Sequence, residues 1–413
     1  MAKDSLTGLE NKQSYMEELD QRLKEKRKTH LIRIDIIHLK SVNERFGHIG
    51  GDTIIKETAR RLQEAVGDVQ IYHTNPITFM VIEEEESDHA GLLEKLSETV
   101  KIADEEVQPK IRLFHMDTNE EDTERSINTI FRYASSKQSL LRERLIGIDE
   151  DLRKEALKEN DLLKEILIGI EKESFMVYYQ PVMDEKSGKM ISAEALSRLI
   201  STKGQFINPG ILFAYAEEKR LNRAITAIVL KKVCRFLGEH KDLDIGSVSV
   251  NMTPDEILDE KMPELLKKAC EEYDVPLSKI RLEMTERTIQ RDPKRINEVM
   301  ENMKELGVSM YLDDFGTGYS NVTSLINMPF ECIKLDKSLV DMIEDEEKAR
   351  MISLICQMIH IGKAKIIAEG VEEKKQEDFL RENGVERIQG WIYSKPLPEN
   401  DFVEFAKGKG RDL

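Results

Sequence analysis

Acidic and amide side chains follow one short apolar segment after another in the second half of the sequence. The polar residues are, in chain order, Glu194, Asn251, Glu283, Asp313, Asp314, Asp336, Glu369 and Gln389. Each stands at or near the end of an apolar run typical of a buried strand. If these strands form one parallel barrel, their carboxyl ends meet at one face, and residues far apart in the sequence come within reach of one another.

Such a face would gather more negative charge than it could hold without cations. Five carboxylates would crowd together there, those of Glu194, Glu283, Asp313, Asp314 and Glu369. Crowded carboxylates repel one another and resist ionisation unless positive charge lies among them. Carboxylate oxygens together with the carbonyl of Asn251 are ligands that suit Mg²⁺ or Mn²⁺. The sequence therefore predicts a divalent-metal site.

The neighbouring pair Asp313 and Asp314 predicts two ions. Adjacent carboxylates can serve two ions held about 3.5–4 Å apart, the arrangement that enzymes use for in-line displacement at phosphorus. The predicted reaction is therefore hydrolysis of a phosphodiester. Taken singly, the elements are less specific: a lone Glu at a strand end is more often a surface residue, and Lys334 could be a surface lysine with a buried stem.

The segment 313–319 allows two other interpretations, and the sequence supports neither. Its Asp-Phe-Gly resembles the magnesium-binding segment of protein kinases, but the chain contains no His-Arg-Asp loop and no Val-Ala-Ile-Lys strand. Gly316 and Gly318 lack the third glycine of a dinucleotide-binding fingerprint.

The spacing of the apolar segments predicts two α/β domains joined by a helix. After residue 172, strands and helices indicate a TIM-like (β/α)8 barrel over residues 172–408. Its expected strands are 176–180, 191–196, 248–251, 280–284, 309–313, 332–336, 365–369 and 387–390. Strands at 31–35 and 79–82 predict a smaller α/β domain over residues 1–140. A helix at 149–170, in a linker over residues 141–171, either covers a domain core or acts as a signalling lever.

A series of motifs in the barrel half resembles the EAL family of cyclic di-GMP phosphodiesterases. In family order the chain contains Tyr-Gln-Pro at 179–181, Glu-Ala-Leu at 194–196 with Arg198, Ser-Val-Asn at 249–251, Glu-Met-Thr-Glu at 283–286, Asp-Asp-Phe-Gly-Thr-Gly-Tyr-Ser at 313–320, Lys-Leu-Asp at 334–336, Ala-Glu-Gly-Val-Glu at 368–372 and Gln-Gly at 389–390. The chain departs from the family at Leu199, usually an aromatic residue, and at 321–323, usually Ser-Leu-Ser.

The resemblance implies a role for each matching residue. The implied ligands of one metal ion are Glu194, Asn251, Glu283 and Asp313, and those of the other are Asp313, Asp314 and Glu369. Lys334 would orient and polarise the attacking water, with Glu369 and Gln389 directing its lone pair toward phosphorus. Glu286 would tether the Asp-Phe-Gly loop.

The family's substrate, cyclic di-GMP, would be converted to the linear dinucleotide pGpG. The residues expected to contact it are Gln180, Leu196, Arg198, Asp336 and Pro396. Arg198 can form a bidentate pair with a phosphate, which a planar guanidinium suits better than a lysine. Trp391 could stack on guanine or pack in the core or at the rim. The family also suggests a homodimer formed through the barrel.

The N-terminal half resembles the GGDEF domain of diguanylate cyclases but lacks its decisive motif. Residues 4–11, Asp35 with Lys40 and Asn43, and residues 46–52 match, whereas residues 75–79 read Asn-Pro-Ile-Thr-Phe. Loss of both acids removes a metal ligand, and Pro76 has no backbone N–H to offer. We therefore expect no cyclase activity. Asp35, Asn43 and Asp52 could retain GTP binding, and a scaffold or dimerisation role is the alternative.

Composition excludes several other classes of function. A formal net charge of -17 argues against binding to a nucleic acid polymer or to an anionic lipid surface. No apolar stretch approaches the ~18 residues of a membrane span, no signal segment is recognisable, and the four cysteines form no CxxC pair. We expect a cytoplasmic protein with free thiols.

The main alternative to an enzyme is a barrel that binds cyclic di-GMP without hydrolysing it, as a receptor or scaffold. Such a chain would be expected to lack one or more metal ligands. This sequence lacks none of them.

Overall fold

The computed structural model describes residues 3–408 except 68, 85, 141 and 318–327. Its internal contacts divide it into two compact units, Met1–Leu162 and Leu163–Leu413. The division falls within helix α5 (Glu150–Glu171), so the boundaries expected at residues 140 and 172 stay predictions. Among the described residues, no helix combines the length and apolar composition that a membrane span requires.

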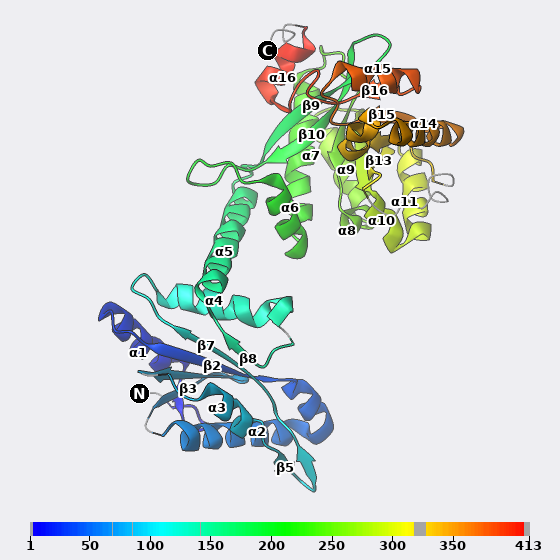
Figure 1. The fold of residues 1–413 in the computed structure, drawn as a ribbon. Coiled ribbons are helices and arrows are strands. Elements are labelled where there is room, and N and C mark those ends of the chain that lie inside the picture. The colour runs from blue at the N-terminus through cyan, green and yellow to red at the C-terminus, as the bar shows by residue number, and fades with distance from the viewer. Residues whose placement is uncertain (1–2, 68, 85, 141, 318–327, 409–413) are drawn as a thin grey trace. The chain divides into compact units, whose positions relative to one another are not determined.

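The N-terminal unit is a six-stranded sheet covered by helices on both faces (Figure 1). The strand order is β1-β3-β4-β2-β7-β8, with bounds Glu10–Asn11, Gln70–Asn75, Thr78–Glu83, His30–Ile37, Lys110–Asp117 and Leu145–Gly147. The helices are α1 (Lys12–Lys24), α2 (Leu39–Val66), α3 (His89–Leu96) and α4 (Glu124–Ser136), and a separate hairpin consists of β5 (Val100–Ile102) and β6 (Glu105–Val107). The predicted α/β architecture and its strands at 31–35 and 79–82 are confirmed.

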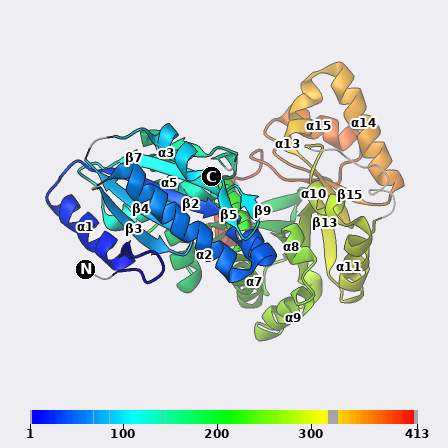
Figure 2. The same cartoon turned by 90° about the horizontal axis from the view of Figure 1, so that it is seen from below.

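Alternate residues of the central strands point to opposite faces of the sheet and pack into two separate hydrophobic cores. Ile32 and Ile34 of β2 pack with α2 and α3 on one face, and Figure 2 shows α2 running along the sheet. Leu31 belongs to the second core, with Tyr15 and Leu19 of α1 and with residues of α4. Because both faces are buried, β4 has four consecutive apolar residues, 79–82, in place of an alternating pattern.

Helix α5 carries apolar residues for both units. Ala156 in its first half belongs to the core under α1 and α4. At Gly169 a Cβ atom would lie 2.9 Å from side-chain atoms of Leu199 and Phe175, so the second half of the helix packs closely on the C-terminal unit's own residues. Each half of the helix therefore packs on the residues of its own unit, and the signalling role stays a prediction. The structure also places Leu199, which departs from the family pattern, beneath this helix.

The C-terminal unit is a closed barrel of eight strands, which confirms the TIM-like prediction. The strands are β9 (Met176–Asp184), β10 (Met190–Arg198), β11 (Ser247–Asn251), β12 (Ile280–Thr285), β13 (Ser309–Phe315), β14 (Cys332–Leu335), β15 (Lys365–Ala368) and β16 (Arg387–Ile388). A short strand, β17 (Leu397–Pro398), is added to β9. All eight expected segments are strands.

The expected repeat of eight strand-helix units is wrong at its first unit. β9 pairs antiparallel with both β10 and β16, whereas β10 to β16 pair in parallel. Only five residues, 185–189, join β9 to β10, which is too few for a crossover helix and suits an antiparallel hairpin. Glu194 consequently lies in the middle of β10 and not near its end.

Helices cover the outside of the barrel, as Figure 1 shows for α7, α9, α11 and α14. The longer helices are α6 (Pro209–Glu218), α7 (Asn222–Glu239), α9 (Met262–Glu272), α11 (Pro293–Glu305), α14 (Glu346–Ile361), α15 (Lys374–Glu382) and α16 (Glu399–Ala406). The short helices are α8 (Pro254–Ile257), α10 (Glu286–Arg291) and α13 (Lys337–Val340). All four cysteines are buried free thiols, as expected.

Candidate active site

Strand register brings the predicted polar residues to one level of the barrel. Glu194 of β10 lies opposite Gln180 on its antiparallel neighbour β9. On the parallel side, Asn251 of β11 lies opposite Glu283 of β12. Asp313 of β13 lies opposite the last residue of β12. The antiparallel first strand therefore still contributes to the carboxyl-end face, where barrel enzymes bind substrates.

Lys334 lies at the centre of the acidic residues. Its ammonium Nζ is 3.1 Å from Glu194 Oε2, 2.7 Å from Glu283 Oε2, 3.0 Å from Asp313 Oδ1 and 2.8 Å from Glu369 Oε1. The residue is 1% exposed, so the interpretation as a surface lysine is wrong. A buried ammonium is tolerated because these carboxylates offset its desolvation.

A chain of amide side chains orients the carboxylate of Glu194. Asn251 Nδ2 donates to Glu194 Oε1 (2.8 Å), and Gln389 Nε2 donates to Glu194 Oε2 (2.6 Å). Gln389 Nε2 also lies 3.1 Å from Gln180 Oε1, and Gln180 Nε2 donates to the carbonyl of Ser394 (3.4 Å). Ser394 was not expected from the sequence, because it contributes only backbone and belongs to no motif.

Carboxylate oxygens gather in two overlapping groups that could each hold a metal ion. One consists of Glu194, Glu283 and Asp313, and the other of Asp313, Asp314 and Glu369; within each group the oxygens lie within 4.8 Å of one another. Asp313 belongs to both groups. Glu283 Oε1 is buried without a hydrogen-bond partner, and one ammonium cannot neutralise five carboxylates. Oxygen donors with unbalanced negative charge fit hard divalent cations.

The carboxylates differ in how readily they ionise. Burial and the charges of Glu194 and Asp313 hold the pKa of Glu283 well above its usual range, despite Lys334. Burial and neighbouring acids likewise raise the pKa of Glu369 to about 8 and that of Asp314 to about 6. Burial also opposes ionisation of Glu194, but Lys334 and the bonds from Gln389 and Asn251 outweigh it and lower its pKa. The site without metal therefore retains protons near neutral pH.

We expect the metal-free protein to become less stable as the pH rises from about 4.5 to 8. Glu369 has a folded-state pKa raised from 4.5 to about 8, so the folded chain binds more protons than the unfolded chain across this window. This loss of stability is absent below about pH 4.5, the pKa of the unfolded chain, and complete above about pH 8, the pKa of the folded chain. Thermal unfolding in chelator at several pH values measures the slope.

Glu369→Gln is the matched control for this pH dependence, because it keeps the shape of the side chain and removes its titration. The variant should show a shallower fall in melting temperature over the same window. An identical slope in both proteins would mean that groups elsewhere govern the pH dependence. Mn²⁺ should raise the melting temperature of the unaltered chain more at pH 8 than at pH 6, because ionised carboxylates bind the ion.

Glu286 holds the turn that follows β13. Its Oε1 accepts a hydrogen bond from the backbone N–H of Gly316 (3.1 Å), and the residue is 8% exposed, unlike an ordinary surface glutamate. Gly316 has φ 105°, and a Cβ atom there would lie 2.5 Å from Leu339, so the turn requires glycine. Residues 318–323, including the departure at 321–323, lie outside the described residues.

The residues expected to contact the substrate differ in their burial and in the partners that they already have. Arg198 is half-buried, with its guanidinium 5.7 Å from the ring centre of Tyr178. Leu196 is half-buried on β10, two residues from Glu194. Asp336 caps α13 by accepting the backbone N–H of Ser338 (2.9 Å).

Pro396 and Trp391 lie in the segment that follows β16. Pro396 directly precedes β17, whose Leu397 pairs with Tyr179 beside Gln180. Trp391 is 57% exposed, so packing in the core is wrong. The Nζ atom of Lys395 lies 4.6 Å from the centre of the Trp391 ring. An exposed aromatic ring beside a lysine remains available for stacking.

The N-terminal candidates lie on β2 and α2, and Asp35 already has hydrogen-bond partners. Both carboxylate oxygens of Asp35 accept from Arg33 Nε (2.9 and 3.0 Å), and Oδ1 also accepts from Thr78 Oγ1 (2.7 Å). Thr78 stands in the segment that replaces the Gly-Gly-Asp-Glu-Phe motif. Asn43 and Asp52 are half-buried residues of α2.

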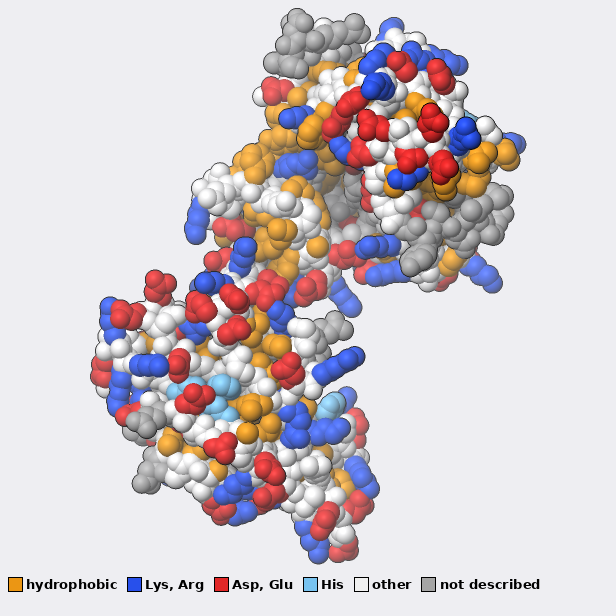
Figure 3. All heavy atoms as spheres, viewed as in Figure 1, with side chains coloured by type: hydrophobic (Ala, Val, Ile, Leu, Met, Phe, Trp, Pro, Cys, Tyr) orange, Lys and Arg blue, Asp and Glu red, His pale blue; other side chains and the backbone are white. Residues whose placement is uncertain are grey.

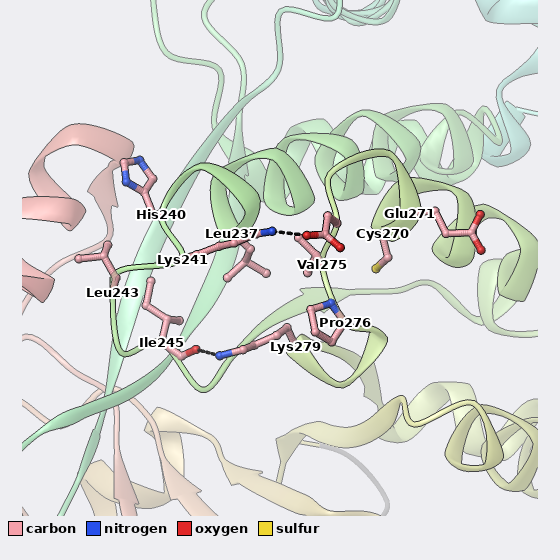
Figure 4. A pocket seen from close by; sticks show the side chains of 11 residues that line it. Leu237, His240, Lys241, Leu243, Ile245, Cys270, Glu271, Val275, Pro276 and Lys279 are labelled. Carbon is pink, nitrogen blue, oxygen red and sulfur yellow. Dashed lines mark hydrogen bonds and ion pairs between the residues drawn. The ribbon is translucent and has the colours of Figure 1, made fainter.

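A pocket at the other end of the barrel is separate from these residues. It lies between the loops that precede β11 and β12 and is lined by Leu237, His240, Lys241, Leu243, Ile245, Cys270, Glu271, Val275, Pro276 and Lys279, among others (Figure 4). Its loops meet the amino ends of the strands. The acidic face is at the carboxyl ends, so this pocket plays no part in the candidate site.

Comparison with protein families agrees with this geometry. Residues 160–396 match the EAL domain. The chain belongs to the EAL domain family. Residues 1–134 match the diguanylate cyclase GGDEF domain, so the chain is a tandem of the two. The first range contains the residues of the acidic face, and the second contains β2 with Asp35.

Two named bacterial proteins are similar to this chain over these regions. The probable cyclic di-GMP phosphodiesterase PdeB of Escherichia coli is 36% identical over 240 residues, which are 58% of this chain and 46% of PdeB. The signaling protein YkoW of Bacillus subtilis is 28% identical over 97% of this chain and 52% of its own length. The chain thus spans about half the length of these relatives.

Solved EAL structures have the same barrel fold. The PaMucR phosphodiesterase in complex with c-di-GMP is 29% identical, with a TM-score of 0.55 over 58% of this chain and 99% of that chain. An EAL domain protein from Listeria monocytogenes is 27% identical, with a TM-score of 0.53 over 59% of this chain and 96% of its own.

Proposed function

We propose that the barrel hydrolyses cyclic di-GMP to pGpG with two divalent metal ions. The observation that carries the proposal is the pair of carboxylate groups that share Asp313 around a buried lysine. Membership of the EAL family and the names of PdeB and the PaMucR complex support the choice of substrate. Mg²⁺ and Mn²⁺ are the ions that oxygen ligands of this kind favour.

The ligands of the two ions follow from the two groups. Glu194, Glu283 and Asp313 would hold one ion, with the Asn251 carbonyl, because its Nδ2 is engaged by Glu194 and its oxygen is left for coordination. Asp313, Asp314 and Glu369 would hold the other. When bound, the ions supply Lewis acidity at the phosphate and lower the pKa of the attacking water.

The chain's own residues position the water and the phosphate. Lys334, whose Nζ contacts Glu369 Oε1, can donate a hydrogen bond to the water and direct its lone pair toward phosphorus. Gln389 keeps Glu194 in place through its amide. A new bond forms between the water oxygen and phosphorus, the bond from phosphorus to O3′ breaks, and a proton passes to the released 3′ oxygen. The product keeps a 5′ phosphate, as pGpG does.

We also propose that the N-terminal unit is not a cyclase. Asp35 is paired with Arg33 and Thr78, and the acids that would complete a metal site are replaced by Ile77 and Thr78. GTP binding through Asn43 and Asp52, or a purely structural role, is left for this unit. Saturable binding of GTP below millimolar concentration would favour a nucleotide-binding role over a purely structural one.

Turnover with and without metal tests the proposed function. The chain, freed of metal by chelator, should leave cyclic di-GMP intact, and added Mn²⁺ or Mg²⁺ should restore its conversion to pGpG on a chromatogram. Supplied with GTP instead, the protein should form no cyclic di-GMP. Binding of cyclic di-GMP without turnover, with both metals present, would overturn the proposal in favour of a receptor.

A further inference from the structure

Three histidines of the N-terminal unit converge at one end of its sheet. His30 begins β2 and His115 lies on β7, its antiparallel neighbour, where Ile32 pairs with His115 and His30 with Asp117. Because alternate residues of a strand point to the same face, His30 and His115 share the face that α3 covers. His89 is the first residue of α3. The pairing of β2 with β7 and the position of α3 therefore bring the three histidines together.

The imidazoles contact one another closely. His30 Nε2 lies 3.2 Å from His89 Nε2, and the ring centres of His89 and His115 are 4.2 Å apart. Glu86, in the loop before α3, brings Oε1 to 3.7 Å from His89 Nδ1 and 3.9 Å from His115 Nδ1. Figure 3 shows histidine side chains, in pale blue, together at the surface of this unit beside acidic side chains.

We propose that His30, His89, His115 and Glu86 form a transition-metal site that takes Zn²⁺ or an ion of similar preference. One ligand atom of each residue lies within 4.8 Å of the others. Atoms bound at 2.0–2.1 Å to a tetrahedral ion are about 3.3–3.4 Å apart, close to the His30 to His89 separation. Imidazole ligands favour Zn²⁺ and its neighbours over Mg²⁺.

A carboxylate behind His30 strengthens the assignment. Asp117 Oδ1 lies 2.7 Å from His30 Nδ1, and Lys28 Nζ lies 3.0 Å from Asp117 Oδ2. With Nδ1 bound to the carboxylate, His30 presents Nε2 and its lone pair to the other histidines. Histidines that ligate metals commonly donate their second ring N–H to a carboxylate in this way, which fixes the tautomer.

Two of the histidines, His89 and His115, are also held in the neutral form that a metal requires. Burial and the neighbouring imidazoles of His115 and His30 lower the pKa of His89 to about 4, and burial lowers that of His115. Neutral rings keep a lone pair for coordination. His30 and His89 are 4% and 6% exposed, while Glu86 lies at the surface, so an ion could enter past the carboxylate.

Cobalt titration of the full chain tests the site, with excess Mg²⁺ present to occupy the oxygen ligands of the barrel. Tetrahedral Co²⁺ bound to nitrogen absorbs visible light far more strongly than six-coordinate Co²⁺ bound to oxygen. The unaltered chain should gain this absorption at one equivalent of Co²⁺ and lose it when Zn²⁺ is added. The absorption should be absent from His89→Ala and unchanged in His48→Ala, a control at an exposed histidine of the same unit.

Two further variants keep the test informative if His89→Ala fails to fold. Asp117→Asn and Glu86→Gln alter exposed carboxylates, and each should weaken Co²⁺ binding by about 10-fold or more without changing the circular dichroism spectrum. The proposal would be overturned by absence of the absorption in the unaltered chain. It would equally be overturned by identical Co²⁺ affinity in the unaltered chain, Asp117→Asn and Glu86→Gln.

Discussion

Glu194→Gln is expected to lower kcat for cyclic di-GMP by about 10²–10³-fold or more with Mn²⁺ saturating. The substitution keeps the length of the side chain, but its single amide oxygen can accept from only one of Asn251 and Gln389, and it removes the negative charge that the proposed first ion requires. It also leaves Lys334 with one carboxylate fewer. Initial rates of pGpG formation at several Mn²⁺ concentrations measure the effect.

Glu331→Gln is the matched control for Glu194→Gln. Glu331 is also a partly buried acid of the barrel paired with a cation, since Arg281 Nε lies 2.9 Å from its Oε2, but it precedes β14 at the opposite end of the strands. Its substitution should change kcat by less than about twofold while lowering the melting temperature slightly. Turnover by Glu194→Gln at the rate of the unaltered chain would remove the metal role from this residue.

Lys334→Met is expected to separate stability from activity. In metal-free protein at pH 8 it should lower the free energy of unfolding by about 3–5 kcal/mol, the usual cost of removing one partner from a buried ion pair. The contacting carboxylates hold the pKa of Lys334 well above its usual range, so its stabilising charge is fully present below about pH 10 and lost only at higher pH. Urea unfolding in chelator measures the loss.

Mn²⁺ should restore most of the stability of Lys334→Met but not its turnover. The ions would replace the missing positive charge among the carboxylates, whereas the hydrogen bond to the attacking water would still be absent. We expect kcat to stay about 10²-fold below that of the unaltered chain. Full recovery of turnover with Mn²⁺ would show that the lysine serves only as a substitute cation.

Lys231→Met provides the control for the lysine experiment. Lys231 lies on α7 and forms an exposed ion pair with Glu173 at 3.4 Å. Exposed pairs of this kind contribute about 0.2–1 kcal/mol, so stability and turnover should stay close to those of the unaltered chain. Comparison of the two variants separates the effect of position from that of losing a lysine.

The types of residue in the acidic site could be recognised from the sequence because strand and helix periodicities are local. Apolar runs of four to six residues predicted all eight barrel strands. The carboxylates beside these runs indicated oxygen ligands and divalent ions, and the motif order indicated the family that the comparison confirms. These inferences need only neighbours along the chain.

Only the tertiary structure decided which groups actually meet. β9 runs antiparallel, because five residues cannot form a crossover helix, and this direction sets Gln180 opposite Glu194. The position of Lys334 among four carboxylates depends on β10, β12, β13 and the residue after β15 at once. The carbonyl of Ser394 accepts a hydrogen bond from Gln180 only because the fold places this backbone segment beside β9.

The histidine cluster shows the same division most clearly. His30, His89 and His115 are widely separated in the sequence and belong to no motif, so their residue types alone suggested nothing. Antiparallel pairing of β2 with β7 and the start of α3 bring their ring nitrogens together. The sequence by itself determined which chemical groups the protein possesses and which local segments carry them. Long-range strand pairing and helix packing decided which of those groups share a site, because contacts between distant residues leave no local periodicity to read.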